Sequence, residues 1–219
     1  MPYTPFAAWL NTVFAGLDEA CGRFAFSLHS GGAGGFFDWF FPAVTLLGSA
    51  GIFFIALGLL SLIFRRSRKM GFTLLVALVL GLLFTNLLLK NAVARPRPYV
   101  DEMSVFFGWW KEIGSGVERE VYSFPSGHAT ASFAAMTAVF WCGNKRYSWT
   151  AFLLAALIGF SRIYLVVHYA SDVLGGAVVG FIAGSLAYLL VTRIGRAIAR
   201  RHPTKTDPKA PKTAAAKAE

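Results

Sequence analysis

Long apolar runs separated by short polar segments set the pattern of this chain. The runs cover residues 36–64, 71–89, 129–142, 149–167 and 173–192. A helix needs about 20 mostly apolar residues to cross the hydrocarbon core of a bilayer. The run 129–142 reaches that length only if the residues before it open the same helix. The pattern predicts an all-α, polytopic membrane helical bundle with five to six transmembrane helices, because the glycines between residues 48 and 51 can divide the first run in two.

The first 35 residues are amphipathic rather than uniformly apolar. Apolar side chains recur there at helical spacing: Phe6, Trp9, Leu10, Val13, Phe14 and Leu17. Asp18, Glu19 and Arg23 interrupt the pattern, which favours a helix lying in the membrane interface over one that spans the bilayer. We therefore expect residues 1–35 to form an N-terminal interfacial segment and residues 36–201 to form the membrane-embedded domain. Residues 202–219 are rich in Lys, Pro and Ala, which predicts a disordered basic tail.

Composition supports the membrane assignment. Hydrophobic residues make up 56% of the chain, charged residues make up 15%, and the mean hydropathy is +0.55, which is typical of a membrane protein rather than a soluble one. A net charge of +10 could indicate a nucleic-acid partner. The basic residues instead cluster beside the apolar runs, where they act as orientation signals, so we expect no nucleic acid to bind.

These basic clusters predict the orientation of the chain. They occupy residues 65–69, 145–146 and 193–201, which fall on one side if the runs alternate across the bilayer. The positive-inside bias makes that side, and the C-terminus, cytoplasmic. Lys90, the connection 91–127 and the ends of the runs near His128 and His168 then share the extracytoplasmic face of a cell membrane.

Three ionisable residues stand within or beside the last two apolar runs: Arg162, His168 and Asp172. Charge at membrane depth is costly, so such residues indicate a functional site, although an isolated arginine can also extend to the interface. His168 and Asp172 are four residues apart, close enough to interact if the local chain is helical. Arg162 precedes His168 by six residues, about 9 Å along a regular helix and on a different face. Its side chain must reach back, or the helix must be irregular there.

Two further segments with candidate site residues are expected on the same face of the membrane. In the first, Lys90 precedes Arg97 by seven positions, and Pro96 and Pro98 hold the chain around Arg97 extended. Arg95 in the same segment fits a simple anchor at a helix end. In the second, residues 125–128 read Pro-Ser-Gly-His before an apolar run, which predicts a helix start. Ser126 fits an ordinary N-cap, while the free amides near Gly127 fit an anion site beside His128.

Together these groups suit phosphoryl transfer. Cations and helix-terminal amides neutralise the non-bridging oxygens of a phosphoryl group. One histidine can act as nucleophile and the other as general acid and base, and Asp172 can fix the tautomer of His168. The sequence contains no carboxylate cluster suited to Mg²⁺ and no His/Cys cluster suited to Zn²⁺. We expect a site without metal or cofactor.

The three segments resemble the signature of the type 2 phosphatidic acid phosphatase superfamily, which includes membrane lipid phosphate phosphatases. The match comprises Lys90-x6-Arg97-Pro98, Pro125-Ser126-Gly127-His128 and Ser161-Arg162-x5-His168-x3-Asp172. The resemblance implies that His168 attacks phosphorus, that Asp172 orients it, and that His128 protonates the leaving oxygen and later activates water. The resemblance also implies phosphate-binding roles for a second set of residues: Lys90, Arg97, Ser126, Gly127 and Arg162.

The membrane-embedded body favours a substrate whose tail stays in the bilayer. The chain looks like bacterial members that act on undecaprenyl pyrophosphate or phosphatidylglycerol phosphate, and we expect undecaprenyl pyrophosphate as the substrate. Phosphatidic acid is a further candidate. The same site could transfer the phosphoryl group to another lipid, and a soluble haloperoxidase fits poorly with five apolar runs. Outside enzymes, the cations could form a head-group site in a lipid transporter or a scaffold. The glycine-rich run 173–192 can pack within the chain or between chains, so the oligomeric state stays open.

Overall fold

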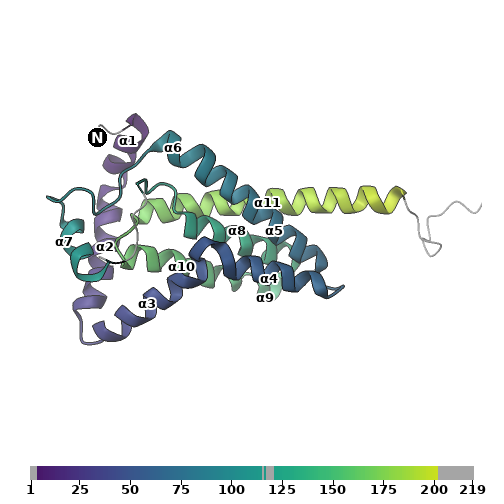
Figure 1. Ribbon diagram of the computed structural model, residues 1–219, viewed down its shortest axis with the longest axis horizontal. Coiled ribbons are helices and arrows are strands. Elements are labelled where there is room, and N and C mark those ends of the chain that lie inside the picture. The colour runs from purple at the N-terminus through teal and green to yellow at the C-terminus, as the bar shows by residue number, and fades with distance from the viewer. Residues whose placement is uncertain (1–3, 115, 117–120, 202–219) are drawn as a thin grey trace, which may run out of the picture.

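The computed structural model describes residues 4–114, 116 and 121–201, so the predicted tail 202–219 lies outside the described part. Helices account for every regular element in these ranges (Figure 1). In chain order they are α1 (Pro5–Val13), α2 (Ala15–Ser30), α3 (Gly34–Gly48), η1 (Ser49–Gly51), α4 (Ile52–Ile63), α5 (Arg68–Leu82), η2 (Leu83–Leu89), α6 (Lys90–Val93), α7 (Val105–Ile113), α8 (Gly127–Cys142), α9 (Lys145–Ser148), α10 (Ala151–Tyr164) and α11 (Ala170–Arg201). The predicted all-α membrane bundle is confirmed.

Helix α8 forms the centre of the bundle and packs extensively against α5, α10 and α11. Glycines on α11 let the two helix backbones approach closely. A Cβ atom on Gly180 would lie 2.5 Å from the Thr130 carbonyl oxygen, and one on Gly176 would lie 2.6 Å from the Ser126 carbonyl oxygen. The glycine-rich run therefore packs within the chain, as small residues do where membrane helices cross.

The first apolar run is divided as the glycines suggested. Helix α3 ends at Gly48, the single turn η1 follows, and α4 begins at Ile52. Two residues in the turn have positive φ, Ala50 at 49° and Gly51 at 68°, which breaks the regular hydrogen bonding of the helix. The break lies beside α8 and shapes the site described below.

Three stretches are long and apolar enough to cross a membrane: Gly34–Ile63, Arg68–Val93 and Ala170–Arg201. The predicted run 129–142 becomes α8, which opens at Gly127 and so includes part of the preceding motif. Helices α8 and α10 have 16 and 14 residues, about 24 and 21 Å long at 1.5 Å per residue, against a core about 30 Å thick. The number of five to six spans therefore stays a prediction.

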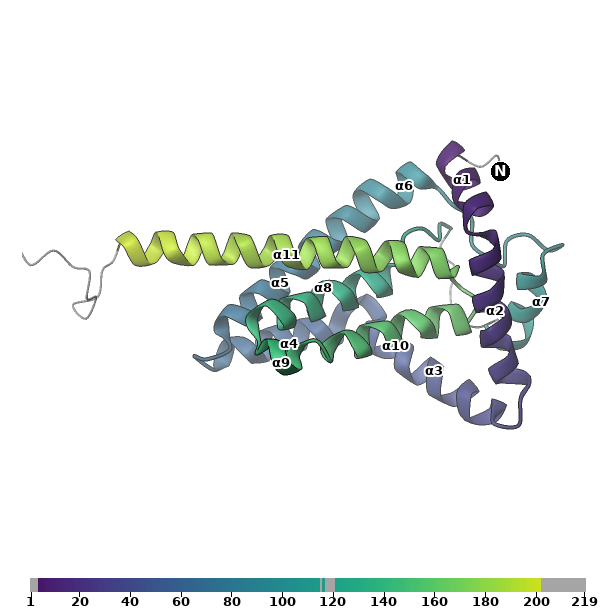
Figure 2. The ribbon, with the colours of Figure 1, turned by 180° about the vertical axis from the view of Figure 1, so that it is seen from behind.

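The N-terminal helices α1 and α2 lie across one end of the bundle rather than along it (Figures 1 and 2). Their outer surface carries exposed apolar side chains, including Phe6, Trp9 and Phe24. This arrangement agrees with an interfacial segment, and its position in a membrane stays a prediction. Asp18, one of the charged residues that interrupt the apolar pattern of this segment, is buried on the inner face of α2.

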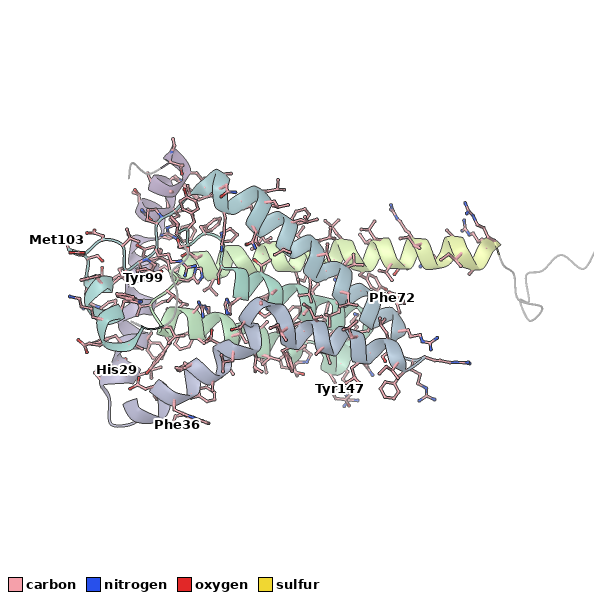
Figure 3. All side chains as sticks on the ribbon, viewed as in Figure 1. His29, Phe36, Phe72, Tyr99, Met103 and Tyr147 are labelled. Atoms are coloured by element: carbon pink, nitrogen blue, oxygen red, sulfur yellow. The ribbon has the colours of Figure 1, made fainter. Side chains whose placement is uncertain are left out.

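The two ends of the bundle differ in character. The α4–α5 turn, α9 and the basic end of α11 lie toward one end, so the three basic clusters are on the same side (Figure 1). Figure 3 places His29, Tyr99 and Met103 at the opposite end, beside α1, α2 and α7. This polarity is the arrangement that the alternation of runs predicts.

Candidate active site

The turn between α10 and α11 carries the centre of the site. Helix α10 ends at Tyr164, and Val166 has a positive φ of 55° that reverses the chain. The amides of Val167 and His168 donate to the carbonyl oxygen of Arg162 at 3.2 and 3.3 Å. The chain is thus irregular between Arg162 and His168, which brings these residues together although a regular helix would separate them.

Asp172 lies in the first turn of α11 and is completely buried. The Tyr169 amide donates to Asp172 Oδ2 at 2.9 Å, which is the side-chain half of a capping box, and the Asp172 amide donates to the Tyr169 carbonyl oxygen at 3.1 Å. Asp172 Oδ2 lies 3.6 Å from His168 Nδ1. The structure therefore brings together the predicted histidine–carboxylate pair, with His168 in the turn rather than on the helix.

Arg95 binds the other oxygen of this carboxylate. Its Nη1 lies 2.7 Å from Asp172 Oδ1, and its Nη2 lies 2.9 Å from Asp18 Oδ2. Arg95 is only 1% exposed, so its interpretation as a helix-end anchor is wrong. Burial by itself would lower the pKa of Arg95, but the Asp172 and Asp18 carboxylates raise it above the ordinary value, which keeps the guanidinium charged.

The N-terminus of α8 faces the same region. Ser126 is the N-cap, and its side chain accepts a hydrogen bond from the Ala129 amide, while its own amide donates to the Asp172 carbonyl oxygen at 3.0 Å. A Cβ added to Gly127 would meet no atom within 4 Å, so the first turn of the helix is accessible to a ligand on that side. His128 follows in the same turn, where the helix dipole favours anions.

The remaining predicted cations come from two other parts of the chain. Lys90 follows η2 and is the first residue of α6. Ala94, with a φ of 48°, ends α6 before the Arg-Pro-Arg-Pro segment. Arg97 Nη1 donates to the Val167 carbonyl oxygen at 2.9 Å, directly before His168 in the chain. Arg162 Nη1 donates to Thr45 Oγ1 at 2.6 Å. Both guanidinium groups are buried beside the turn.

A cavity of about 580 Å³ connects these groups. Four of the predicted site residues line it: Lys90, Gly127, His128 and His168. The other four are almost completely buried: Arg97, Ser126, Arg162 and Asp172. Hydrogen bonds connect these four residues to the segment around His168 and Asp172. Arg162 also binds Thr45 of α3. The rest of the cavity wall comes from the end of α3, the η1 turn, α4, α5, η2 and α8. It is largely apolar, with polar side chains at Thr85, Asn86 and Thr130.

Sequence reasoning missed several residues that shape the site. Gly48 gives His128 its space, because a Cβ at position 48 would lie 2.7 Å from His128 Cδ2. Thr45 binds Arg162, and Asp18 binds Arg95. Only Asp18 carried a usable signal, since it shares a helical face with the buried Gly22 and Ala25. The other contacts join residues too distant in sequence for a periodic pattern to indicate them.

Within residues 4–114, 116 and 121–201, no three or more His, Cys, Asp or Glu side chains gather in a way that could hold a metal ion. The expectation of a site without metal stays a prediction.

Known proteins resemble this chain in sequence and in structure. The profile of the PAP2 superfamily matches residues 70–196. Phosphatidylglycerophosphatase B of Bacillus subtilis is 30% identical over 203 residues, which cover 88% of this chain and 78% of that protein. Undecaprenyl-diphosphatase of Sulfolobus acidocaldarius is 31% identical over 123 residues, 55% of each chain. The crystal structure of Aquifex aeolicus LpxE superposes with a TM-score of 0.60 at 28% identity, covering 74% of this chain and 91% of that one.

The matches differ in extent. The chain spans 49% to 60% of the length of the first three curated relatives that it matches. The family profile nevertheless covers more than half of this chain, and it includes every predicted site residue. The profile match and the 30% identity to phosphatidylglycerophosphatase B over most of both chains lead to one conclusion: this chain belongs to the PAP2 superfamily.

Proposed function

We propose that this protein is an integral membrane phosphatase that hydrolyses a lipid phosphate through a phosphohistidine at His168. The observation that carries the proposal is the cavity, which brings His168, His128, Lys90 and the N-terminus of α8 to one surface. A nucleophile, a second titratable histidine and anion-binding groups are the set that phosphoryl transfer requires.

The proposed reaction has two steps. In the first, Asp172 holds the Nδ1–H of His168, and Nε2 attacks phosphorus as the bond to the leaving oxygen breaks. His128 gives that oxygen its proton. In the second step His128 takes a proton from water, the resulting hydroxide attacks phosphorus, and the P–N bond breaks. Inorganic phosphate leaves, and both histidines return to their starting states.

The proposed role of the surrounding cations is electrostatic. Lys90 lines the cavity, and the N-terminus of α8 presents the Gly127 amide beside Ser126. Arg97 and Arg162 lie behind the turn, where their charge acts at short range in a medium of low dielectric constant. These groups offset the negative charge on the phosphoryl oxygens, which is the main contribution of a protein to this class of reaction.

The shape of the cavity favours a lipid substrate. Its apolar wall includes Val79 and Leu82, which are 56% and 58% exposed on the outer surface of α5. The cavity therefore reaches from the histidines toward the side of the bundle that we expect to contact lipid. A substrate could keep its hydrocarbon tail in the bilayer while its phosphate lies at His168.

Among lipid substrates we propose undecaprenyl pyrophosphate, with phosphatidylglycerol phosphate and phosphatidic acid as the alternatives. One relative is named an undecaprenyl-diphosphatase and another a phosphatidylglycerophosphatase, and these names support the choice of candidates. Transfer of the phosphoryl group to a second lipid uses the same first step and differs only in the acceptor.

One experiment tests the function, its substrate and its two histidines. The purified protein is assayed for inorganic phosphate released from undecaprenyl pyrophosphate, phosphatidylglycerol phosphate and phosphatidic acid. We expect the highest kcat/KM with undecaprenyl pyrophosphate. His168→Ala and His128→Ala should each lower phosphate release by at least about 100-fold, the usual contribution of an acid–base group.

Thermal unfolding in detergent controls for folding of the two variants. Full turnover in a folded variant would contradict the mechanism. Phosphorylated acceptor lipid without free phosphate would favour the transferase alternative, and a higher kcat/KM with another substrate in the panel would reassign the substrate.

A glycine-to-alanine pair on α3 tests the position of His128. Gly48→Ala places a methyl group 2.7 Å from His128 Cδ2, and an ångström of displacement can cost about 100-fold in rate. Gly35→Ala is the matched control in the same helix, because a Cβ there meets nothing within 4 Å. We expect kcat to fall 10- to 100-fold in Gly48→Ala only. Equal rates in the two variants would show that the ring does not depend on this packing.

We also propose that the site faces the extracytoplasmic side of the cell membrane, with the C-terminus cytoplasmic. Met103 is 95% exposed at the end of the bundle that carries the site, and Tyr147 is 61% exposed toward the other end (Figure 3). In a background lacking Cys21 and Cys142, Met103→Cys should react with an impermeant thiol reagent in intact cells. Tyr147→Cys should react only after permeabilisation. The reverse pattern would contradict the orientation.

A further inference from the structure

Asp18 and Arg95 form a buried ion pair to which the proposed mechanism gives no role. Asp18 comes from the inner face of α2, and Arg95 comes from the extended segment after α6. Their side chains are 3% and 1% exposed. Arg95 of this pair binds Asp172 Oδ1, whereas His168 Nδ1 lies near the other oxygen, Oδ2.

Every polar atom of the Asp18 carboxylate has a partner. Oδ1 accepts from the Ser171 amide at 2.8 Å. Oδ2 accepts from Ser171 Oγ at 2.8 Å and from Arg95 Nη2 at 2.9 Å. The Asp18 side chain thus binds both the backbone amide and the side chain of Ser171, the residue next to Asp172.

Arg95 is fixed just as completely. Nη1 donates to Asp172 Oδ1 and to Ser171 Oγ, both at 2.7 Å, and Nε donates to Asn11 Oδ1 of α1 at 2.8 Å. The guanidinium also lies over the Tyr169 ring, 4.0 Å from its centre. Because the group is planar and held at several points, it sets the direction from which Asp172 Oδ1 is bound.

This network fixes the orientation of the Asp172 carboxylate. Arg95 binds Oδ1, and the Tyr169 amide binds Oδ2, so the carboxylate cannot rotate. Oδ2 is thereby kept 3.6 Å from His168 Nδ1. Docking of α2 would not by itself need buried charges, because apolar residues of similar size commonly hold helices together as well or better.

We propose that Asp18 and Arg95 are positioning residues for the Asp172–His168 pair, which makes α2 part of the catalytic unit and not only an anchor in the membrane interface. The inference rests on the roles proposed above for His168 and Asp172. Asp18 acts through Arg95 and Ser171 and does not touch the reacting atoms.

Asp18 also balances charge around the histidine. Several titratable or charged groups of the described residues surround Asp172 and His168. Around Asp172 they are Arg95 on the extended segment, Asp18 on α2 and Tyr169, whose ring lies under Arg95. Around His168 they are Asp172, Arg97, Arg162, Lys90 and His128. Cys21 on α2 stays neutral, because burial and the Asp18 carboxylate raise the pKa of its thiol. Without the charge of Asp18, the positive charge of Arg95 would be offset by Asp172 alone. The Asp172 carboxylate would then stabilise a protonated His168 less. The imidazole would then lose its proton at a lower pH.

The test compares Asp18→Asn with Glu19→Gln, using phosphate release from dioctanoyl phosphatidic acid by the full chain in detergent. Both variants remove one acid from the same helix, but Glu19 is exposed and pairs only with Arg23 among the contacts that the structure describes. For Asp18→Asn we expect kcat about 10-fold lower, KM within 2-fold of the parent, and the acidic limb of the kcat/KM profile at lower pH. Glu19→Gln should match the parent in all three.

Further variants cover the possible failures. Asp18→Glu keeps the charge, so it should keep the acidic limb of the parent even if kcat falls. If Asp18→Asn does not fold, Ser171→Ala removes the Oγ that donates to Asp18 and accepts from Arg95, without a change in charge. That variant should lower kcat at least 3-fold at constant KM.

Several results would overturn the proposal. Parent kcat in folded Asp18→Asn, or an equal loss in Glu19→Gln, would do so. A lower kcat with an unmoved acidic limb would show that Asp18 only docks α2, and parent kcat in Ser171→Ala would contradict the positioning role where that variant is used. His168→Ala separates this failure from failure of the function: if it is inactive while Asp18→Asn behaves as the parent, only the inference is lost.

Discussion

A fully buried carboxylate, that of Asp172, is the constraint on which the site depends. An ionised carboxylate in an apolar bundle is unstable unless charge and hydrogen bonds surround it. Arg95 and the Tyr169 amide supply those partners, and His168 lies close to the second oxygen. Satisfying one acid therefore fixes the start of α11, the turn that carries His168 and the extended segment that carries Arg95.

The membrane environment explains why the site is built from buried groups. The bundle contains a cavity whose inner end is polar and whose outer wall is largely apolar, and helices form most of that wall. In such a medium each charge acts over a longer distance than it would in water. In the proposed function, a small number of cations, one helix terminus and two histidines would therefore bind and transfer the phosphoryl group, and the same apolar surroundings would accept the hydrocarbon tail of the substrate.

Much of this could be predicted from the sequence. The apolar runs indicated a helical membrane bundle, and the chemistry of Arg162, His168 and Asp172 indicated a site where such residues are costly. The sequence could not show that Val166 reverses the chain or that Asp18 reaches Arg95, 77 positions away. Both depend on tertiary packing. A single positive φ and a long-range ion pair leave no periodic trace, so Asp18 was visible only as an interruption of an apolar pattern, and Arg95 was interpreted as an anchor.

The most direct measurement of the central claim is the capture of the covalent intermediate. The purified protein is mixed with a lipid phosphate labelled with ³²P, quenched in alkali within milliseconds, digested and analysed by mass spectrometry. The account predicts label on the ring of His168, stable in alkali and lost in acid. Label on another residue, or a full single turnover without protein-bound phosphate at any time, would contradict it.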